Sequence, residues 1–202
     1  MKEQVIQSVA IFCGSSKGNN PIYEEIASEY SALLAKDKIK IVYGGGSTGI
    51  MGVVAETALQ HSGYVIGVAP GFLNEKEVVH KGLHELHIVN DMLERKALLM
   101  EMSDAFAILP GGIGTMDEFF EVFTALQLET MHKPIGILNV NGYYDMLIEF
   151  LERMVKDQFF RKEHFNDLII SSEPVQFHTQ LINHKPIKVE SWVNELRKNN
   201  KF

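Results

Sequence analysis

The chain has 202 residues, of which 46% are hydrophobic and 22% are charged, a composition typical of soluble globular proteins. Its 19 basic and 26 acidic residues give a net charge of −7, which excludes a global positive field that would gather nucleic acid or an acidic membrane surface. A single cysteine, Cys13, excludes an internal disulfide framework, and the sequence has neither a signal-peptide pattern nor an apolar run of membrane-spanning length. We therefore expect one cytoplasmic domain over residues 1–202, with no nucleic acid or membrane among its partners.

Short apolar runs alternate with stretches whose apolar residues recur at helical spacing. The runs predict strands at residues 8–13, 39–43, 64–69, 85–89, 104–109 and 134–140. Helices are predicted at 21–36, from the glycine-rich 44–52 segment to about 61, and at 91–102, 119–129 and 143–156, with a loop at 70–81. This alternation predicts an α/β fold, a doubly wound and mainly parallel sheet with helices on both faces.

Beyond residue 159 the pattern weakens, and we expect a largely helical C-terminal extension. Residues 168–170 suggest a short extra strand and residues 174–183 a helix, while residues 189–202 form a charged amphipathic segment.

Three predicted strands end in loops of small residues. Gly14-Ser15-Ser16 follows the first strand, Gly44-Gly45-Gly46 follows the second and Pro110-Gly111-Gly112 follows the fifth. Ligands of such sheets bind beyond the carboxyl ends of the strands, so we expect these loops, with Ser15, Gly45 and Gly46 among the contacts, to line one ligand site.

The loop Gly44-Gly45-Gly46-Ser47-Thr48-Gly49 also matches the dinucleotide fingerprint G-x-G-x-x-G. That fingerprint expects an acidic residue at the end of the next strand, where this chain has Val68-Ala69-Pro70-Gly71. An NAD-linked oxidoreductase is therefore disfavoured. The absence of a Lys-Ser/Thr pair after the glycines argues against a P-loop.

His80, His84 and His87 suggest a metal site only superficially. On a strand His84 and His87 would face opposite sides, and no cysteine or carboxylate cluster completes a ligand set. We expect no metal. Arg95 is more informative, because it lies in the first turns of a helix that follows the fourth strand, where a guanidinium can hold a phosphate or orient a carboxylate.

The stretch from Leu109 to Glu118 is the most informative of the chain. A buried strand, a glycine-rich turn and a helix start together form an anion cradle, because glycine permits close approach and the helix N-terminus offers unpaired N–H groups. Glu118 adds a carboxylate to that cradle. A structural alternative is a capping box, in which Thr115 caps the helix and Glu118 folds back onto the Thr115 N–H.

Taken together, these segments resemble the LONELY GUY (LOG) family of cytokinin riboside 5′-monophosphate phosphoribohydrolases, over about residues 8–159. The resemblance rests on Tyr43-Gly44-Gly45-Gly46, Gly49-Ile50-Met51-Gly52, Glu94-Arg95-Lys96 and Pro110-Gly111-Gly112-x-Gly114-Thr115-x-x-Glu118.

The resemblance implies a Rossmann-like homodimer without a cofactor. It would hydrolyse the N-glycosidic bond of a purine nucleoside 5′-monophosphate, with adenine or N6-prenyladenine as the base, to free base and ribose 5-phosphate. Arg95 and Glu118 would be catalytic. The implied substrate contacts are Glu77, Lys96, Gly111, Gly112, Ile113, Gly114, Thr115 and Thr124.

The chain departs from the family pattern at several positions. Leu93 replaces a frequent histidine, Ile113 replaces an aromatic residue, Asp117 replaces a glutamate, and residues 123–128 lack a frequent tryptophan. These changes put the base preference in doubt more than the reaction. An older lysine decarboxylase label attached to such sequences is set aside, because nothing marks a lysine for a pyridoxal Schiff base. The glycine loops alone would also support a non-catalytic nucleotide-binding or sensing module.

Overall fold

A computed structural model describes residues 5–74, 79–185 and 187 of the chain. Its centre is a seven-stranded sheet in the order β4-β3-β2-β1-β5-β6-β7, and every neighbouring pair is parallel. The predicted α/β fold with a parallel sheet is confirmed. The strands are β1 Ser8–Phe12, β2 Lys40–Tyr43, β3 Val65–Pro70, β4 Glu85–Val89, β5 Ala105–Ile108, β6 Ile135–Leu138 and β7 Ile169–Ser171.

Helices follow most of the strands. They are α1 Ile22–Lys36, α2 Gly49–Gln60, α3 Gly71–Asn74, α4 Met92–Glu101, α5 Ile113–Gln127, α6 Asp145–Lys156, α7 Lys162–Asp167 and α8 Pro174–Asn183, with a 3-10 turn, η1, at Val140–Gly142. The predicted helix at 174–183 and strand at 85–89 have the predicted bounds, and the other predicted elements differ by a few residues at their ends.

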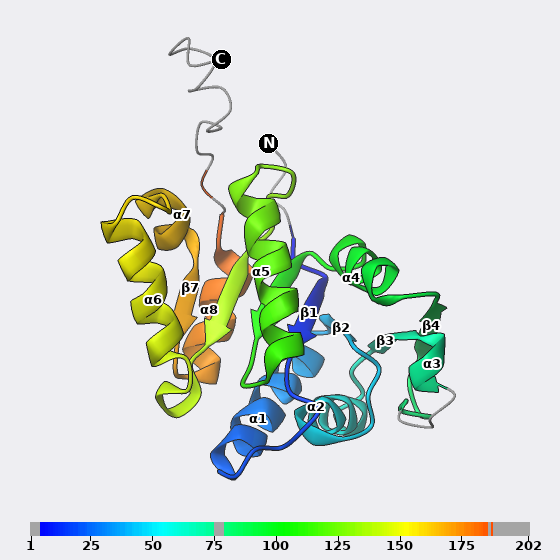
Figure 1. The fold of residues 1–202 in the computed structure, drawn as a ribbon. Coiled ribbons are helices and arrows are strands. Elements are labelled where there is room, and N and C mark those ends of the chain that lie inside the picture. The colour runs from blue at the N-terminus through cyan, green and yellow to red at the C-terminus, as the bar shows by residue number, and fades with distance from the viewer. Residues whose placement is uncertain (1–4, 75–78, 186, 188–202) are drawn as a thin grey trace.

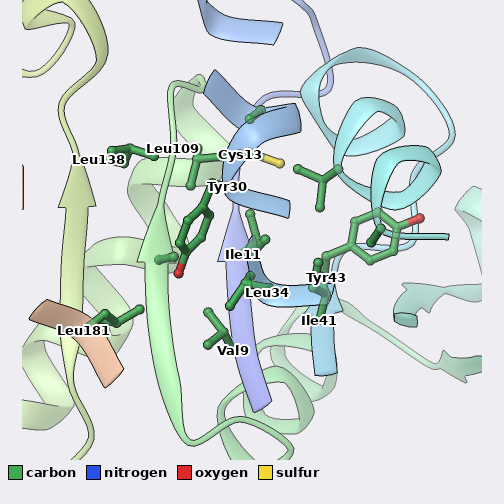
Figure 2. Close-up of a cluster of buried hydrophobic side chains, with 14 of the residues drawn as sticks. Val9, Ile11, Cys13, Tyr30, Leu34, Ile41, Tyr43, Leu109, Leu138 and Leu181 are labelled. Carbon is green, nitrogen blue, oxygen red and sulfur yellow. The ribbon is translucent and has the colours of Figure 1, made fainter. Parts of the chain in front are cut away.

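The helices cover both faces of the sheet (Figure 1). Side chains of α1, α2 and α8 pack with one set of alternating strand residues, and those of α4, α5 and α6 pack with the other set. Figure 2 shows part of the first layer, in which Tyr30 and Leu34 of α1 lie against Val9 and Ile11 of β1. Because both faces are covered, β1, β3, β5 and β6 are buried throughout, as their continuous apolar sequences predict.

The order in which successive strands are added to the sheet reverses between β1 and β5. From β1 the strands run outward to β4 on one side, and from β5 they run outward to β7 on the other. Loops at such a switch point diverge and leave room for a ligand. The loops after β1 and β5 meet there, where the Gly14 N–H donates to the Pro110 carbonyl at 3.0 Å.

Several local features differ from the sequence-based expectations. Helix α5 begins at Ile113, ahead of the expected start. The four-residue helix α3 occupies the beginning of the predicted 70–81 loop, and the short, charged helix α7 has no clear periodicity in the sequence. The amphipathic segment at 189–202 lies outside the described residues.

Candidate active site

The glycine-rich turn after β5 is open on its outer side. Gly112 is the N-cap of α5 and no side chain caps the helix, so the N–H groups of its first turn have no intrahelical acceptors. A Cβ built on Gly112 or Gly114 would meet no atom within 4 Å. The turn therefore presents backbone donors and a helix N-terminus to open space, which is the geometry of an anion cradle.

The inner side of the same turn is packed against the Thr115 side chain and the Gly14 backbone. A Cβ on Gly111 would lie 2.1 Å from the Thr115 Oγ1 and 2.8 Å from the Gly14 nitrogen. Gly49, with a φ of +66°, lies equally close to Ser15, since a Cβ there would approach the Ser15 carbonyl carbon to 2.2 Å. The three small-residue loops predicted to share one site do come together at this edge of the sheet.

Thr115 does not cap α5. It is the third residue of the helix and is buried, and Met116 donates the first intrahelical bond to the Gly112 carbonyl. Because the helix begins ahead of Thr115, Glu118 lies in the second turn, too far along for a capping box. The capping-box alternative is wrong.

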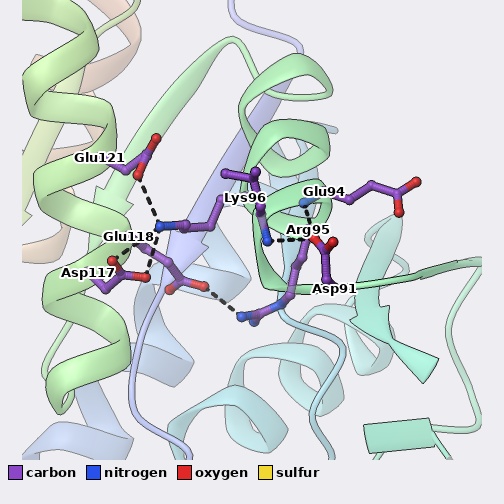
Figure 3. A network of polar contacts seen from close by, with 8 residues as sticks. Asp91, Glu94, Arg95, Lys96, Asp117, Glu118 and Glu121 are labelled. Carbon is purple, nitrogen blue, oxygen red and sulfur yellow. Dashed lines mark hydrogen bonds and ion pairs between the residues drawn. The ribbon is translucent and has the colours of Figure 1, made fainter. Parts of the chain in front are cut away.

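Glu118 instead forms a buried ion pair with Arg95 (Figure 3). The Arg95 Nη1 lies 3.1 Å from the Glu118 Oε1, and each residue is only 8% exposed. The Arg95 Nε donates to the Val68 carbonyl of β3 at 3.0 Å. Gly44 makes room for the guanidinium, because a Cβ there would lie 2.0 Å from the Arg95 Nη2.

The environment of this pair favours a partly protonated carboxyl group. Burial raises the pKa of Glu118 to about 7; the Arg95 charge lowers it and the Asp117 charge raises it. Cys13 follows β1. Burial raises the pKa of its thiol, the Glu118 charge raises it further and the Arg95 charge lowers it. Cys13 is thus a protonated, buried thiol, while Glu118 can exchange its proton near neutral pH.

Lys96 follows Arg95 on α4 and makes a second contact with α5. Its Nζ lies 3.1 Å from Asp117 and 3.0 Å from Glu121, so it joins α4 to α5 (Figure 3). The hydrogen bond to Glu121 raises the pKa of Lys96, which remains a charged ammonium group. Asp117 and Glu118 therefore point to different partners, as expected for adjacent helix positions.

The other predicted contacts are more dispersed. Ser15 is exposed, and its carbonyl accepts a hydrogen bond from Thr48; Gly45 and Gly46 lie in the loop beside Arg95. Thr124 is exposed about 9 Å along the α5 axis from Glu118, at a rise of 1.5 Å per residue. Glu77 lies outside the described residues.

The three histidines of the suspected metal site have separate local roles. His80 accepts a hydrogen bond from the Gly82 N–H, His84 stacks on Tyr64, and His87 pairs with Glu85. Within residues 5–74, 79–185 and 187, no group of three potential ligands is assembled to hold a metal ion.

Some features of the site are missing from the sequence-based prediction. The Val68 carbonyl that anchors Arg95 belongs to a strand far away in sequence. Tyr143 and Tyr144, which follow β6, donate to carbonyls of the glycine turn. The tyrosines had one available signal, since they stand at the carboxyl end of a strand that neighbours β5.

Comparison with known proteins identifies related sequences. A family model described as "Possible lysine decarboxylase" matches residues 51–181. A protein of Oryza sativa subsp. japonica named "Probable cytokinin riboside 5'-monophosphate phosphoribohydrolase" is 46% identical over 77% of this chain and 69% of its own length. A protein of Rhodococcoides fascians named "Cytokinin riboside 5'-monophosphate phosphoribohydrolase" is 44% identical over 76% of this chain and 78% of its own.

A solved structure supports the fold. The molybdenum cofactor binding protein of Rippkaea orientalis superposes with a TM-score of 0.63 at 20% identity, covering 87% of this chain and 94% of that one. At this identity the likeness concerns the fold alone. The sequence relatives and the matching family model together establish that the chain belongs to the LONELY GUY family of cytokinin riboside 5′-monophosphate phosphoribohydrolases.

Proposed function

We propose that this protein hydrolyses the N-glycosidic bond of a purine nucleoside 5′-monophosphate, with adenine or N6-prenyladenine as the base, to give the free base and ribose 5-phosphate. The named activity of the relatives supports this function. The observation that carries it in this chain is the buried Arg95–Glu118 pair, which lies beside an open, glycine-lined helix start.

The phosphate is assigned to the start of α5. Unpaired N–H groups of the first turn, in the segment from Gly111 to Thr115, bind it there, and the Gly44–Gly49 loop lines the site. Gly114 precedes Glu118 by four residues, about 6 Å along the helix axis. That separation leaves room for the ribose between the phosphate and the carboxylate, so the anchored phosphate positions the reacting carbon.

Glu118 acts on the ribose. As the glycosidic bond breaks, its electron pair leaves with the base and the ribose becomes oxocarbenium-like, which an ionised carboxylate stabilises. Water then adds to C1′ and loses a proton, and the base nitrogen gains one. Arg95 is a poor proton donor because its pKa is too high, and its role is to orient Glu118. A charged Lys96 is unsuited to Schiff-base formation, which requires a neutral amine.

The residues that depart from the family pattern flank this site. Leu93 lies near the start of α4 and Ile113 begins α5, and both side chains are exposed. We assign them to the region of the base or its N6 substituent, where they influence base preference rather than the reaction.

The test is chromatography of the products formed from adenosine 5′-monophosphate, N6-isopentenyladenosine 5′-monophosphate and the corresponding nucleosides. Free base from the monophosphates but not from the nucleosides would support the proposed function, and the relative rates would give the base preference. Nucleotide binding without release of base would contradict it and favour a non-catalytic binding or sensing module.

The assembly and location are also part of the proposal. Family resemblance supports a homodimer, and a monomeric mass by light scattering at micromolar concentration would contradict it. Across the described parts of the chain, the structure contains no helix that is both long and apolar enough to cross a membrane. Composition and cysteine content support a cytoplasmic location.

A further inference from the structure

The turn after β6 brings two tyrosines to the glycine turn after β5. It contains Asn141 and Gly142, both with positive φ, and a Cβ on Gly142 would lie 2.5 Å from the Asp145 carboxylate. The turn ends in Tyr143 and Tyr144, whose rings contact each other edge to face at 4.8 Å. Both phenol groups thus reach the neighbouring strand end from one rigid turn.

The two hydroxyls bond to different carbonyls of the glycine turn. The Tyr143 hydroxyl donates to the Gly111 carbonyl at 2.7 Å, and the Tyr144 hydroxyl donates to the Leu109 carbonyl at 2.7 Å. The intervening Pro110 carbonyl accepts the Gly14 N–H at 3.0 Å. Three consecutive carbonyls are therefore fixed by donors from the protein.

Fixing a carbonyl also fixes the N–H of the next residue. The peptide bond is planar and trans here, so its C=O and N–H point in opposite directions. Tyr143 therefore directs the N–H of Gly112 away from its own ring. The outer side of Gly112 is open. Tyr144 fixes the peptide before Pro110, whose nitrogen carries no proton, so it orients no N–H group of the turn.

We propose that Tyr143 is a positioning residue for the 5′-phosphate: its hydroxyl holds the Gly111–Gly112 peptide so that the Gly112 N–H points at the phosphate. This inference rests on the proposed function. The only proton of the hydroxyl is already donated to Gly111, so Tyr143 acts through the backbone rather than by contacting the phosphate. Tyr144 stabilises the fold of the turn instead.

The two tyrosines also differ in what their hydroxyls contribute to stability. Tyr144 is 4% exposed, so Tyr144→Phe leaves the buried Leu109 carbonyl without its donor. Tyr143 is 44% exposed, so water can replace its hydroxyl in Tyr143→Phe. The phenylalanine ring of the Tyr143→Phe variant would keep the edge contacts with the rings of Tyr23 and Tyr144.

The experiment compares wild type, Tyr143→Phe and Tyr144→Phe by base release from adenosine 5′-monophosphate, calorimetric binding of ribose 5-phosphate and thermal unfolding. Tyr143→Phe is expected to raise the KM and the ribose 5-phosphate Kd by about three- to tenfold, the effect of one hydrogen bond, with kcat changed less than about twofold. Tyr144→Phe is expected to lower Tm more than Tyr143→Phe does while changing the Kd less. Tyr64→Phe removes an exposed hydroxyl bond to Glu85, remote from the turn, and serves as the matched control.

An unchanged Kd in Tyr143→Phe, or equal Kd changes in Tyr143→Phe and Tyr64→Phe, would overturn the proposal. A wild-type protein that releases no base but binds ribose 5-phosphate would contradict the proposed function alone, and the binding comparison would still decide the role of Tyr143. A wild type that does not bind ribose 5-phosphate would overturn both.

Discussion

At the scale of single residues, the candidate site depends on a carboxyl group buried beside one guanidinium. Burying an ion pair has a desolvation cost that the pair interaction repays only with good geometry. Arg95 has that geometry, because its Nε is fixed by the Val68 carbonyl while its Nη1 holds Glu118. The burial that raises the pKa of Glu118 also strengthens its interaction with a developing positive charge on the ribose.

The raised pKa of Glu118 predicts a pH dependence. The proposed mechanism requires an ionised Glu118, whose pKa is raised to about 7, so it predicts that kcat falls roughly tenfold per pH unit below about 7 and levels off above it. The measurement is kcat at saturating nucleotide from about pH 5.5 to 8.5.

The substrate phosphate also titrates near this range, with a second pKa of about 6. A variant at Asp117 distinguishes the titration of Glu118 from that of the phosphate. The Asp117 charge raises the pKa of Glu118, so Asp117→Asn should move the midpoint of the kcat profile to lower pH. A midpoint that is the same in wild type and Asp117→Asn would show that Glu118 does not set the profile.

Gly44 is predicted to be essential for the position of Arg95. A methyl group at residue 44 would lie 2.0 Å from the Arg95 Nη2, so Gly44→Ala is expected to shift the guanidinium, which Val68 and Glu118 hold by its other nitrogens. We expect kcat to fall by about 10²-fold or more, as for the loss of one preorganised group. Gly71→Ala, whose Cβ would come no closer than 3.8 Å to its neighbours, is the control and should retain activity. Equal activities of the two variants would refute this role of Gly44.

At the scale of elements, the N-terminal turns of two helices carry the side chains of the candidate site. Helix α4 carries Arg95 in its first turns and α5 carries Glu118, and Lys96 joins the two helices through Asp117 and Glu121. The starts differ in kind: a side chain caps α4, whereas α5 begins at an uncapped glycine. The uncapped start is the one available to an anion.

The cap of α4 makes a testable contribution to stability. The Asp91 carboxylate accepts the N–H groups of Leu93 and Glu94 at 2.9 Å each. Asp91→Ala should lower the free energy of unfolding by about 1 kcal/mol, which corresponds to a fall in Tm of about 2–4 °C for a chain of this size. Asp91→Asn retains an N-cap acceptor, so its free energy of unfolding should fall by less than that of Asp91→Ala. Thermal unfolding measures both, and an Asp91→Ala protein as stable as wild type would contradict the cap.

At the scale of the whole molecule, the reversal of strand order between β1 and β5 explains why the loops after these strands meet. The strands and the parallel sheet were predictable from sequence, because strands buried on both faces read as continuous apolar runs, whereas the strand order was not. The edge strand β4 was also recognisable, and its charged Glu85 and half-buried His87 suit a strand paired on one side only.

What the sequence did not reveal is set by contacts between distant segments. Thr115 offered a good local cap, yet tertiary packing against Gly111 places the start of α5 ahead of it. No local pattern connects Arg95 with the Val68 carbonyl, or Tyr143 with Gly111. The motif named Arg95 and Glu118 as candidate site residues, and the structure adds the contacts that orient them.

The most direct test of the account is release of free base from adenosine 5′-monophosphate by wild type and by Glu118→Gln, with nucleotide binding measured on both. Glutamine keeps the size of the side chain but removes its negative charge. The account predicts that kcat falls by about 10²- to 10⁴-fold while the nucleotide Kd changes by less than about threefold. A Glu118→Gln protein that releases base at the wild-type rate would remove Glu118 from the mechanism and contradict the account.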